Sequence, residues 1–172
     1  MDSCGVKVKF TLNAQAIGTS INPNIKLALR ALRNIGLTST GTGAAQANEI
    51  FGYYQKSLAI STSVTYDLRS YTNVLGETAK ALAEVRVLYV EHDSSSTATS
   101  ITVGNAASNQ FVPLGMSSAT TTFTLVPGAG FLMWDPSAAA MTADGTHKDI
   151  KILNNSASAA AIYNIYAIGS IS

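Results

Sequence analysis

The sequence predicts an all-β fold, a single-domain β-sandwich with a jelly-roll-like arrangement of strands. Short segments of alternating apolar and polar residues recur along the chain at a spacing of roughly 8–15 residues. These segments are rich in β-branched residues, and Gly, Pro and Asn separate them. Many short strands between such turns are typical of sandwiches and jelly rolls, and no repeat of fixed period indicates a propeller or solenoid.

The N-terminal region contains one clear strand and one ambiguous segment. Residues 1–24 are expected to form an N-terminal strand and a possible arm, and residues 25–172 the sandwich domain. Alternation over Val6–Leu12 indicates a half-buried strand, which an Asn-Pro-Asn turn follows. Ile25–Ile35 is left open, because its first apolar residues alternate as in a strand while its basic residues recur at helical spacing.

The rest of the chain is expected to consist mainly of strands. Val85–Glu91 has apolar residues on both faces, with Val85, Val87 and Tyr89 on one side, which is typical of a central strand. Phe111–Leu114 is expected at an edge because Pro113 cannot donate to a ladder, and Pro127-Gly128 is expected to form a tight turn. The expected strands are Lys56–Tyr66, Val85–Glu91, Thr99–Gly104, Phe111–Leu114, Thr120–Val126, Gly130–Trp134, Lys148–Asn154 and Ala161–Gly169.

Charge is scarce in this chain. Charged residues make up 12% of its 172 residues, and no charged side chain occurs from Ser94 through Trp134. Because surface charge usually keeps a monomer in solution, this stretch suggests a surface that is covered in use; the alternative is a surface solvated by hydroxyls and amides alone. The net charge is +1 and basic residues occur at most in pairs, so no nucleic-acid partner is expected.

The single cysteine, Cys4, excludes an intrachain disulfide and is consistent with assembly in a reducing cytoplasm. The first residues lack the basic start and apolar core of a signal peptide. No apolar run approaches the roughly 20 residues of a membrane span. We therefore expect a soluble protein made in the cytoplasm, with no membrane partner.

No residue pattern indicates catalysis. The two histidines, His92 and His147, each have one carboxylate nearby, but no spacing typical of a zinc site occurs, and two solvated loop histidines are the expectation. No nucleophile motif is present, and the Gly-rich pieces at 41–43 and 128–130 lack the strand, helix and lysine of a phosphate loop. We expect no enzyme activity and no cofactor.

Aromatic residues offer two interpretations. Phe51, Tyr53 and Tyr54, together with Trp134, could line a sugar-binding platform, or they could serve core and interface packing. The edge segment Phe111–Leu114 is a candidate for pairing between chains. The candidate interface residues are Phe51, Tyr53, Tyr54, Phe111, Val112 and Leu114.

The stretch Thr40–His92 resembles a group of short virion structural proteins of tailed bacteriophages. The similar features are a Gly-Thr-Gly-Ala loop, a Leu-Ala-rich strand, an Asp-Leu turn and an Arg-Val-Leu-Tyr-Val strand. The resemblance favours a strand over Ile25–Arg30, although the segment up to Asn34 matches poorly. It continues through Ser100–Val103, Thr122–Pro127, Gly128–Met133, Ile150–Asn155 and Tyr163–Gly169.

This resemblance implies a β-sandwich virion component, present in many copies and without activity. The expectation is a head decoration or minor capsid protein that assembles with itself, with a trimer as the guess, and with other virion proteins such as the major capsid protein. It would be located in the virion after assembly in the host cytoplasm. A tail, neck or fibre-base subunit and a carbohydrate-binding β-sandwich module are the alternatives.

Overall fold

The computed structural model describes residues 6–7, 36–37, 49–73, 76–112, 120–135 and 141–171, and every structural statement below refers to these residues. They form strands and connecting segments and contain no helix. The strands are β1 (Val6–Lys7), β2 (Gly36–Leu37), β3 (Glu49–Leu58), β4 (Ser63–Asp67), β5 (Leu82–His92), β6 (Ile101–Gly104), β7 (Thr122–Leu125), β8 (Gly130–Trp134), β9 (Met141–Thr142), β10 (Asp149–Asn154) and β11 (Ala161–Ile171).

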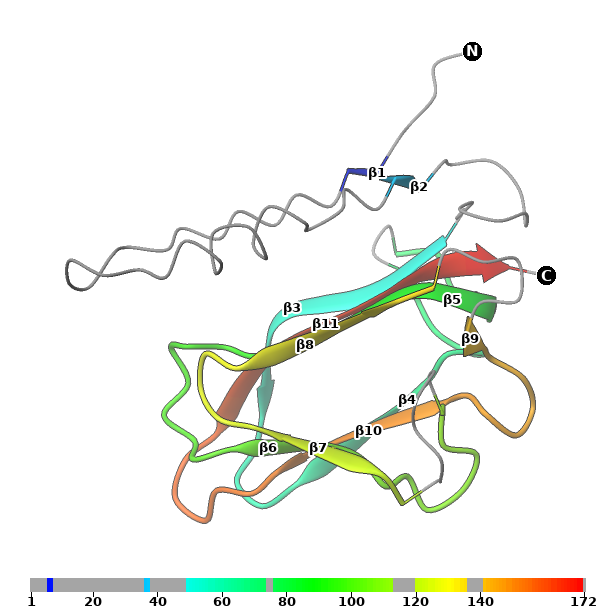
Figure 1. Cartoon of the computed structure of the whole chain (residues 1–172). Coiled ribbons are helices and arrows are strands. Elements are labelled where there is room, and N and C mark those ends of the chain that lie inside the picture. Colours follow the sequence, from blue (N-terminus) through cyan, green and yellow to red (C-terminus); the bar gives the residue numbers. More distant parts are fainter. Residues whose placement is uncertain are drawn as a thin grey trace, which may run out of the picture.

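Two antiparallel sheets face each other and form the sandwich (Figure 1). The five-stranded sheet has the order β3-β11-β5-β8, with β9 also paired to β5, and the four-stranded sheet has the order β4-β10-β6-β7. Apart from β6 to β7, each successive main strand from β3 to β11 crosses to the opposite sheet. This alternation is the jelly-roll topology, and it confirms the predicted fold class.

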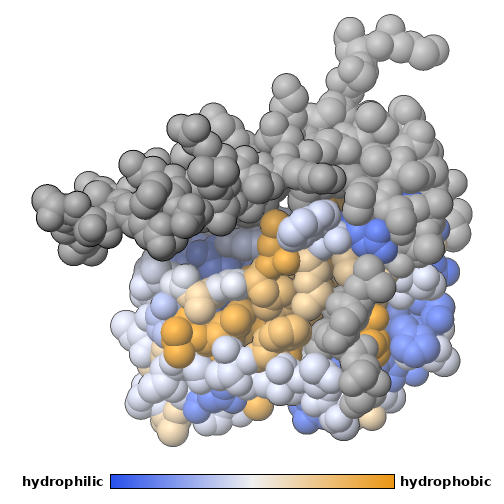
Figure 2. Space-filling view, in the orientation of Figure 1, coloured by the Kyte–Doolittle hydropathy of each residue, from blue (hydrophilic) through white to orange (hydrophobic). Residues whose placement is uncertain are grey.

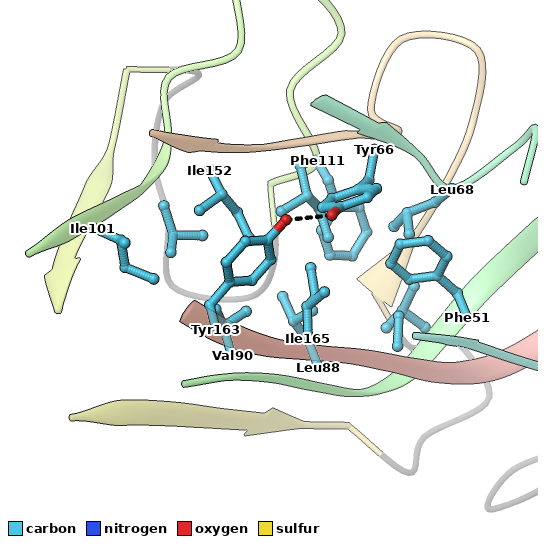
Figure 3. Close-up of a cluster of buried hydrophobic side chains, with 14 of the residues drawn as sticks. Phe51, Tyr66, Leu68, Leu88, Val90, Ile101, Phe111, Ile152, Tyr163 and Ile165 are labelled. Carbon is cyan, nitrogen blue, oxygen red and sulfur yellow. Dashed lines mark hydrogen bonds between the residues drawn. The ribbon is translucent and has the colours of Figure 1, made fainter. Parts of the chain in front are cut away.

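The core lies between the sheets and consists of side chains from the inward face of each strand (Figure 3). Phe51, Val90 and Ile165 come from the five-stranded sheet, and Ile101 and Ile152 from the four-stranded sheet; all are at most 1% exposed. Each such side chain contributes about 1.5–3 kcal/mol when fully buried. The core therefore holds the two sheets at a fixed separation.

Two polar contacts also cross between the sheets. The hydroxyl groups of Tyr66 on β4 and Tyr163 on β11 are hydrogen-bonded in the middle of the core (Figure 3). At one end of the sandwich, the ring of His92 on β5 makes a hydrogen bond through Nδ1 with the carbonyl of Leu125 on β7, at 3.1 Å. Buried polar groups need such partners, so these contacts constrain how the sheets pack.

Several expected elements are confirmed. Gly130–Trp134 is β8, the expected strands at 148–154 and 161–169 contain β10 and most of β11, and β5 is central between β11 and β8. In the turn between β7 and β8, Gly128 has φ of 80° and the amide of Ala129 donates to the carbonyl of Val126 at 2.9 Å. A proline followed by a glycine with positive φ gives a type II turn, as Pro127-Gly128 predicts.

The expected strand Lys56–Tyr66 is wrong, because a turn divides it. β3 ends at Leu58, Ser61 has φ of 54°, and β4 begins at Ser63 in the other sheet. The backbone amide of Thr62 donates to the carbonyl of Ala59 at 3.3 Å and closes this turn. The apolar alternation continues across the crossover, so periodicity alone could not detect the turn.

The expected edge strand at 111–114 is also wrong for the two of its residues that the structure describes. Phe111 and Val112 lie in no strand, and only Gln110 makes an isolated bridge, to Asp149. Phe111 is 3% exposed and belongs to the core. Pro113 and Leu114 lie outside the described residues.

The two faces of β5 differ from the expectation because of a bulge. Gly169 on β11 pairs with Val85, whereas the preceding Ile168 pairs with Val87, so one residue of β5 is extra. Val85 therefore joins the core with Leu88, while Val87 lies on the other face beside Trp134 and is 2% exposed there. A Cβ on Gly169 would lie 1.8 Å from the carbonyl oxygen of Glu84, so this close approach requires glycine.

The N-terminal expectations fall mostly outside the described residues. Of the expected strand Val6–Leu12, the structure describes Val6–Lys7, which pairs with β2 and with neither sheet of the sandwich. Ile25–Ile35 is not described. The described part of the sandwich begins at Glu49.

Candidate interaction surface

The outer face of the five-stranded sheet carries two cross-strand rows that are almost entirely apolar. Strand registers place them side by side across β3, β11, β5 and β8. Side chains point alternately to the two faces of a sheet, so residues two apart on a strand share this face. The first row is Ile50, Ile168, Val87 and Trp134, and the second is Gly52, Tyr166, Tyr89 and Leu132. Ile168 and Val87 are only 7% and 2% exposed, Trp134 is exposed, and the other members are half-buried.

A stacked pair of tyrosines forms the centre of this face. The rings of Tyr89 and Tyr166 have centroids 6.4 Å apart and an interplanar angle of 19°. The ring of Tyr166 also lies over Gly52, where an added Cβ would be 2.3 Å from its Cδ1 atom. Burial, and then the hydrogen bond to Glu91, raise the pKa of Tyr89 above the usual tyrosine range. Gly52 therefore leaves the room that lets a ring lie flat on the sheet.

A polar network borders the apolar rows. Asn164 on β11 accepts a hydrogen bond from the backbone amide of Gln55 at 2.7 Å and donates to Glu91 at 3.0 Å. Gln55 has φ of 46° and lies opposite the register shift between Tyr163 and Ile165. The asparagine side chain thus satisfies the amide that the irregular β3 leaves without a ladder partner.

The side of the sandwich where β7 and β8 lie is apolar as well. Figure 2 shows hydrophobic residues gathered over this side. Phe123 on β7 and Phe131 on β8 pack with ring centroids 4.8 Å apart, which closes the space between the two sheets. The cavity that remains behind them has a volume of about 20 Å³, so there is no room for a ligand.

An aromatic pocket lies at the opposite side of the sandwich, next to β3 and β4. Its volume is about 400 Å³. Tyr53 and Tyr66 stack in its wall, with centroids 5.2 Å apart, and the Lys56 ammonium lies 5.1 Å from the centroid of the Tyr53 ring. The lining residues are Phe51, Tyr53, Thr65, Tyr66, Asp67, Ser70, Tyr71, Thr72 and Ala79.

Tyr71 is the unusual member of this pocket. Its side chain is 8% exposed, and its hydroxyl has no hydrogen-bond partner among the described residues. Burial, and then the nearby carboxylate of Glu49, raise its pKa above the usual range, so the hydroxyl stays protonated. A buried hydroxyl without a partner costs about 1–3 kcal/mol.

The structure places the predicted interface residues in different environments. Tyr54 is 69% exposed on the outer side of β3, and Tyr53 and Val112 are half-buried. Phe51 and Phe111 are 1% and 3% exposed in the core, so neither is available for an interface on this chain. They are core residues because each extends from its segment into the space between the sheets. Leu114 lies outside the described residues.

The predicted sugar platform does not form. Phe51 is in the core and Tyr53 lies beside it, whereas Tyr54 is exposed on the outer side of β3. Trp134, 51% exposed, is on β8 at the far edge of the sheet order β3-β11-β5-β8. Alternation along β3 and the two intervening strands keep these aromatic residues apart.

The two histidines also differ from each other. His147 is exposed in a loop, as expected, and contacts the carboxylate of Asp144 at 3.2 Å. His92 is fully buried at the end of β5, where its Nε2 is 2.9 Å from the Ser96 hydroxyl oxygen, so the expectation of a solvated loop residue is wrong. Burial lowers the pKa of His92, and the hydrogen bond with the Leu125 carbonyl opposes this shift in part.

Two buried polar residues gave no clear signal in the sequence. Asn154 on β10 is 1% exposed and donates to the carbonyls of Leu58, Ala59 and Ala159, which joins the two turns at one end of the sandwich. Arg86 on β5 is fully buried, and its Nη2 lies 2.5 Å from Oε2 of Glu84. Both lie in strands whose apolar pattern suggested ordinary packing, so only tertiary contacts reveal their roles.

Other kinds of site are not found among the described residues. The described residues contain no group of three or more His, Cys, Asp or Glu side chains that could hold a metal ion. Within the same residues no helix is long and apolar enough to cross a membrane. No protein-family model, curated protein or solved structure matches this chain.

Proposed function

We propose that this chain is a non-enzymatic structural subunit of a bacteriophage virion, a head decoration or minor capsid protein. The support is the resemblance of residues 40–169 to phage virion proteins, together with the surface described above. A jelly-roll fold alone would not carry this proposal, because one fold serves many functions. The structural observation that supports it is the accessible part of the outer face of the five-stranded sheet, which consists of the exposed Trp134 and the half-buried Tyr89, Tyr166 and Leu132.

That face has the composition of a protein interface. Its accessible part combines two tyrosines, a tryptophan and a leucine on the neighbouring strands β11, β5 and β8. Interfaces are enriched in tyrosine and tryptophan and depleted of charge in their centre. A decoration protein needs such a surface because many weak contacts of about 800 Å² each can hold it on a repeating lattice.

The proposed partners are other copies of this chain and the virion proteins beneath it, such as the major capsid protein. A closed homo-oligomer, with a trimer as the working expectation, would match the symmetry of a capsid lattice. The virion is the proposed location, after assembly in the host cytoplasm. A position in the tail, neck or fibre base would use the same surface on a different neighbour.

Antibody-labelled electron microscopy of intact particles tests this proposal. Particles purified from the phage that carries the gene would be labelled with an antibody against this chain. Label distributed over the head supports decoration, whereas label confined to the tail vertex moves the chain to the alternative location. Particles that lack the chain, as judged by mass spectrometry, would refute the structural role.

The aromatic pocket favours carbohydrate binding as a second candidate function. Its volume of about 400 Å³ lies in the range of small-molecule sites, and its lining combines tyrosines with the hydroxyls of Thr65, Ser70 and Thr72. Calorimetric titration with a panel of oligosaccharides tests this candidate, and Tyr53→Ala is expected to abolish any binding. If no oligosaccharide gives a heat of binding, carbohydrate binding by this pocket is excluded for the sugars of the panel.

A further inference from the structure

The outer edge of β8 presents backbone groups that pair with no other strand among the described residues. The Asp135 amide donates to the carbonyl of Arg86, and the His92 amide donates to the carbonyl of Ala129, so these pairs are hydrogen-bonded. Because hydrogen-bonded and non-hydrogen-bonded pairs alternate along an antiparallel ladder, the groups of Phe131 and Met133 also point to β5. Gly130, Leu132 and Trp134 therefore direct their N–H and C=O groups outward, away from β5.

This edge lacks the features that usually prevent edge pairing. The opposite edge strand, β3, has the positive φ of Gln55 and the exposed Lys56, which disturb a flat ladder. The edge strand β4 of the other sheet ends in Asp67, which is paired with Lys148. β8 has neither charge nor bulge, and its pairing with β5 is regular over its whole length.

The side chains of β8 are self-complementary. Gly130 and Trp134 are placed symmetrically about Leu132. If two β8 strands pair antiparallel with Leu132 opposite Leu132, each Gly130 lies opposite a Trp134, and the indole can cover the glycine. The same chain already uses this arrangement where Tyr166 lies over Gly52.

Charge also favours a second copy of this chain over a different partner. The chain has no charged residue from Ser94 through Trp134, which includes β7, β8 and the turn between them. Two copies can therefore approach across this side without like-charge repulsion, and a charged partner would find no counter-charge in this stretch. The approach would also cover the apolar side that Figure 2 shows.

We propose that β8 pairs antiparallel with β8 of a second copy about a two-fold axis at Leu132. The pairing joins the two five-stranded sheets into one continuous sheet, and each outward N–H and C=O of Gly130, Leu132 and Trp134 gains a partner in the other copy. This inference deepens the proposed assembly role by naming a joint and its partner. Because a two-fold joint gives a dimer or an even multiple, it replaces the trimer of the working expectation. It rests on the edge of β8, so it can be wrong while the chain is still a virion subunit.

Variants that introduce a charge at the axis test this pairing in purified full-length protein. Opposed residues across a ladder have Cβ atoms about 4.5–5.5 Å apart, so Leu132→Lys places two ammonium groups together, and Leu132→Glu places two carboxylates together. Light scattering behind a sizing column should show a dimer, or an even multiple, for the unchanged protein. Each variant alone should associate at least roughly tenfold more weakly. An equimolar mixture of the two variants should restore the association.

Tyr54→Lys is the matched control, because it adds the same charge to β3, an edge strand of the same sheet, at a site that is 69% exposed. It should leave the mass unchanged, and circular dichroism should show that all variants are folded. A monomer that persists up to roughly 1 mM overturns the proposal. An oligomer that resists Leu132→Lys overturns it equally, because its joint then lies elsewhere. Both results would leave the proposed virion role standing, because antibody labelling of particles tests that role separately.

Discussion

The five-stranded and the four-stranded sheet share one core, but their outer faces carry different side chains. The outer face of the four-stranded sheet is mostly polar, with a row of Ser63, Leu153, Thr102 and Thr124 and a neighbouring pair of Thr65 and Lys151. The corresponding rows of the five-stranded sheet are apolar and aromatic, as described above. Water can solvate the first surface without help, whereas the half-buried Tyr89, Tyr166 and Leu132 of the second gain free energy when another surface covers them.

The sheets also differ in length and regularity. The principal strands of the five-stranded sheet, β3, β5 and β11, have 10, 11 and 11 residues, and the strands of the four-stranded sheet have 4 to 6. The long strands contain register shifts, which the short strands lack. The larger sheet thus depends on particular small residues at its irregular positions, and the smaller one on ordinary ladder pairing.

The largest expected effect tests that dependence. Gly169→Ala would place a Cβ 1.8 Å from the carbonyl oxygen of Glu84, so β11 and β5 must separate. We expect the free energy of unfolding to fall by about 3 kcal/mol or more, measured by urea denaturation. Gly145→Ala is the control, since an added Cβ meets nothing within 4 Å, and it should change stability by less than about 0.5 kcal/mol. Equal effects of the two changes would contradict this account.

A smaller effect tests how the core joins the two sheets. Tyr163→Phe removes one hydroxyl of the Tyr66–Tyr163 pair and leaves the other buried without a partner. The expected loss is about 1–3 kcal/mol, and Tyr66→Phe should behave in the same way. The double variant should lose less than the sum of the two, because it leaves no hydroxyl unpaired. Strict additivity in this double-mutant cycle would mean that the two hydroxyls do not interact.

The second polar contact between the sheets predicts a pH dependence. Burial lowers the pKa of His92, so below the unfolded-state value of about 6.5 the unfolded chain binds a proton that the folded chain resists. The free energy of unfolding should therefore be independent of His92 above that pH and should decline as the pH falls below it, by up to about 1.4 kcal/mol per pH unit. Urea unfolding between pH 7 and 5 measures this slope. His92→Gln should flatten it, and the exposed His147→Gln should not.

The smallest effect on stability is expected on the outer faces themselves. Tyr54→Ser and Trp134→Ser remove two exposed aromatic side chains from the five-stranded sheet, and Thr65→Ser with Thr124→Ser changes the polar face. All four should alter the unfolding free energy by less than about 0.5 kcal/mol. Retention on a hydrophobic-interaction column should fall for the aromatic pair alone. Equal retention of both pairs would mean that the two faces do not differ as surfaces.

Local sequence patterns were enough to predict the fold class and the positions of many strands. β8, β10, β11 and the Pro127-Gly128 turn follow from local alternation and turn chemistry, which act between residues close in sequence. The functional expectation came from resemblance to phage proteins and stays a proposal. Among the predicted interface residues, Tyr54 is on the surface, whereas Phe51 and Phe111 are in the core. A sequence pattern distinguishes buried from exposed aromatic residues poorly.

The tertiary structure alone decided which face of each strand is inside. Val85 is in the core and Val87 outside because of a register shift that depends on β11 and on the missing side chain of Gly169. Phe111, His92 and Tyr71 have their environments set by segments far away in the chain. Burial and hydrogen bonding depend on which strands become neighbours, and the neighbours in this jelly roll are mostly not consecutive in sequence.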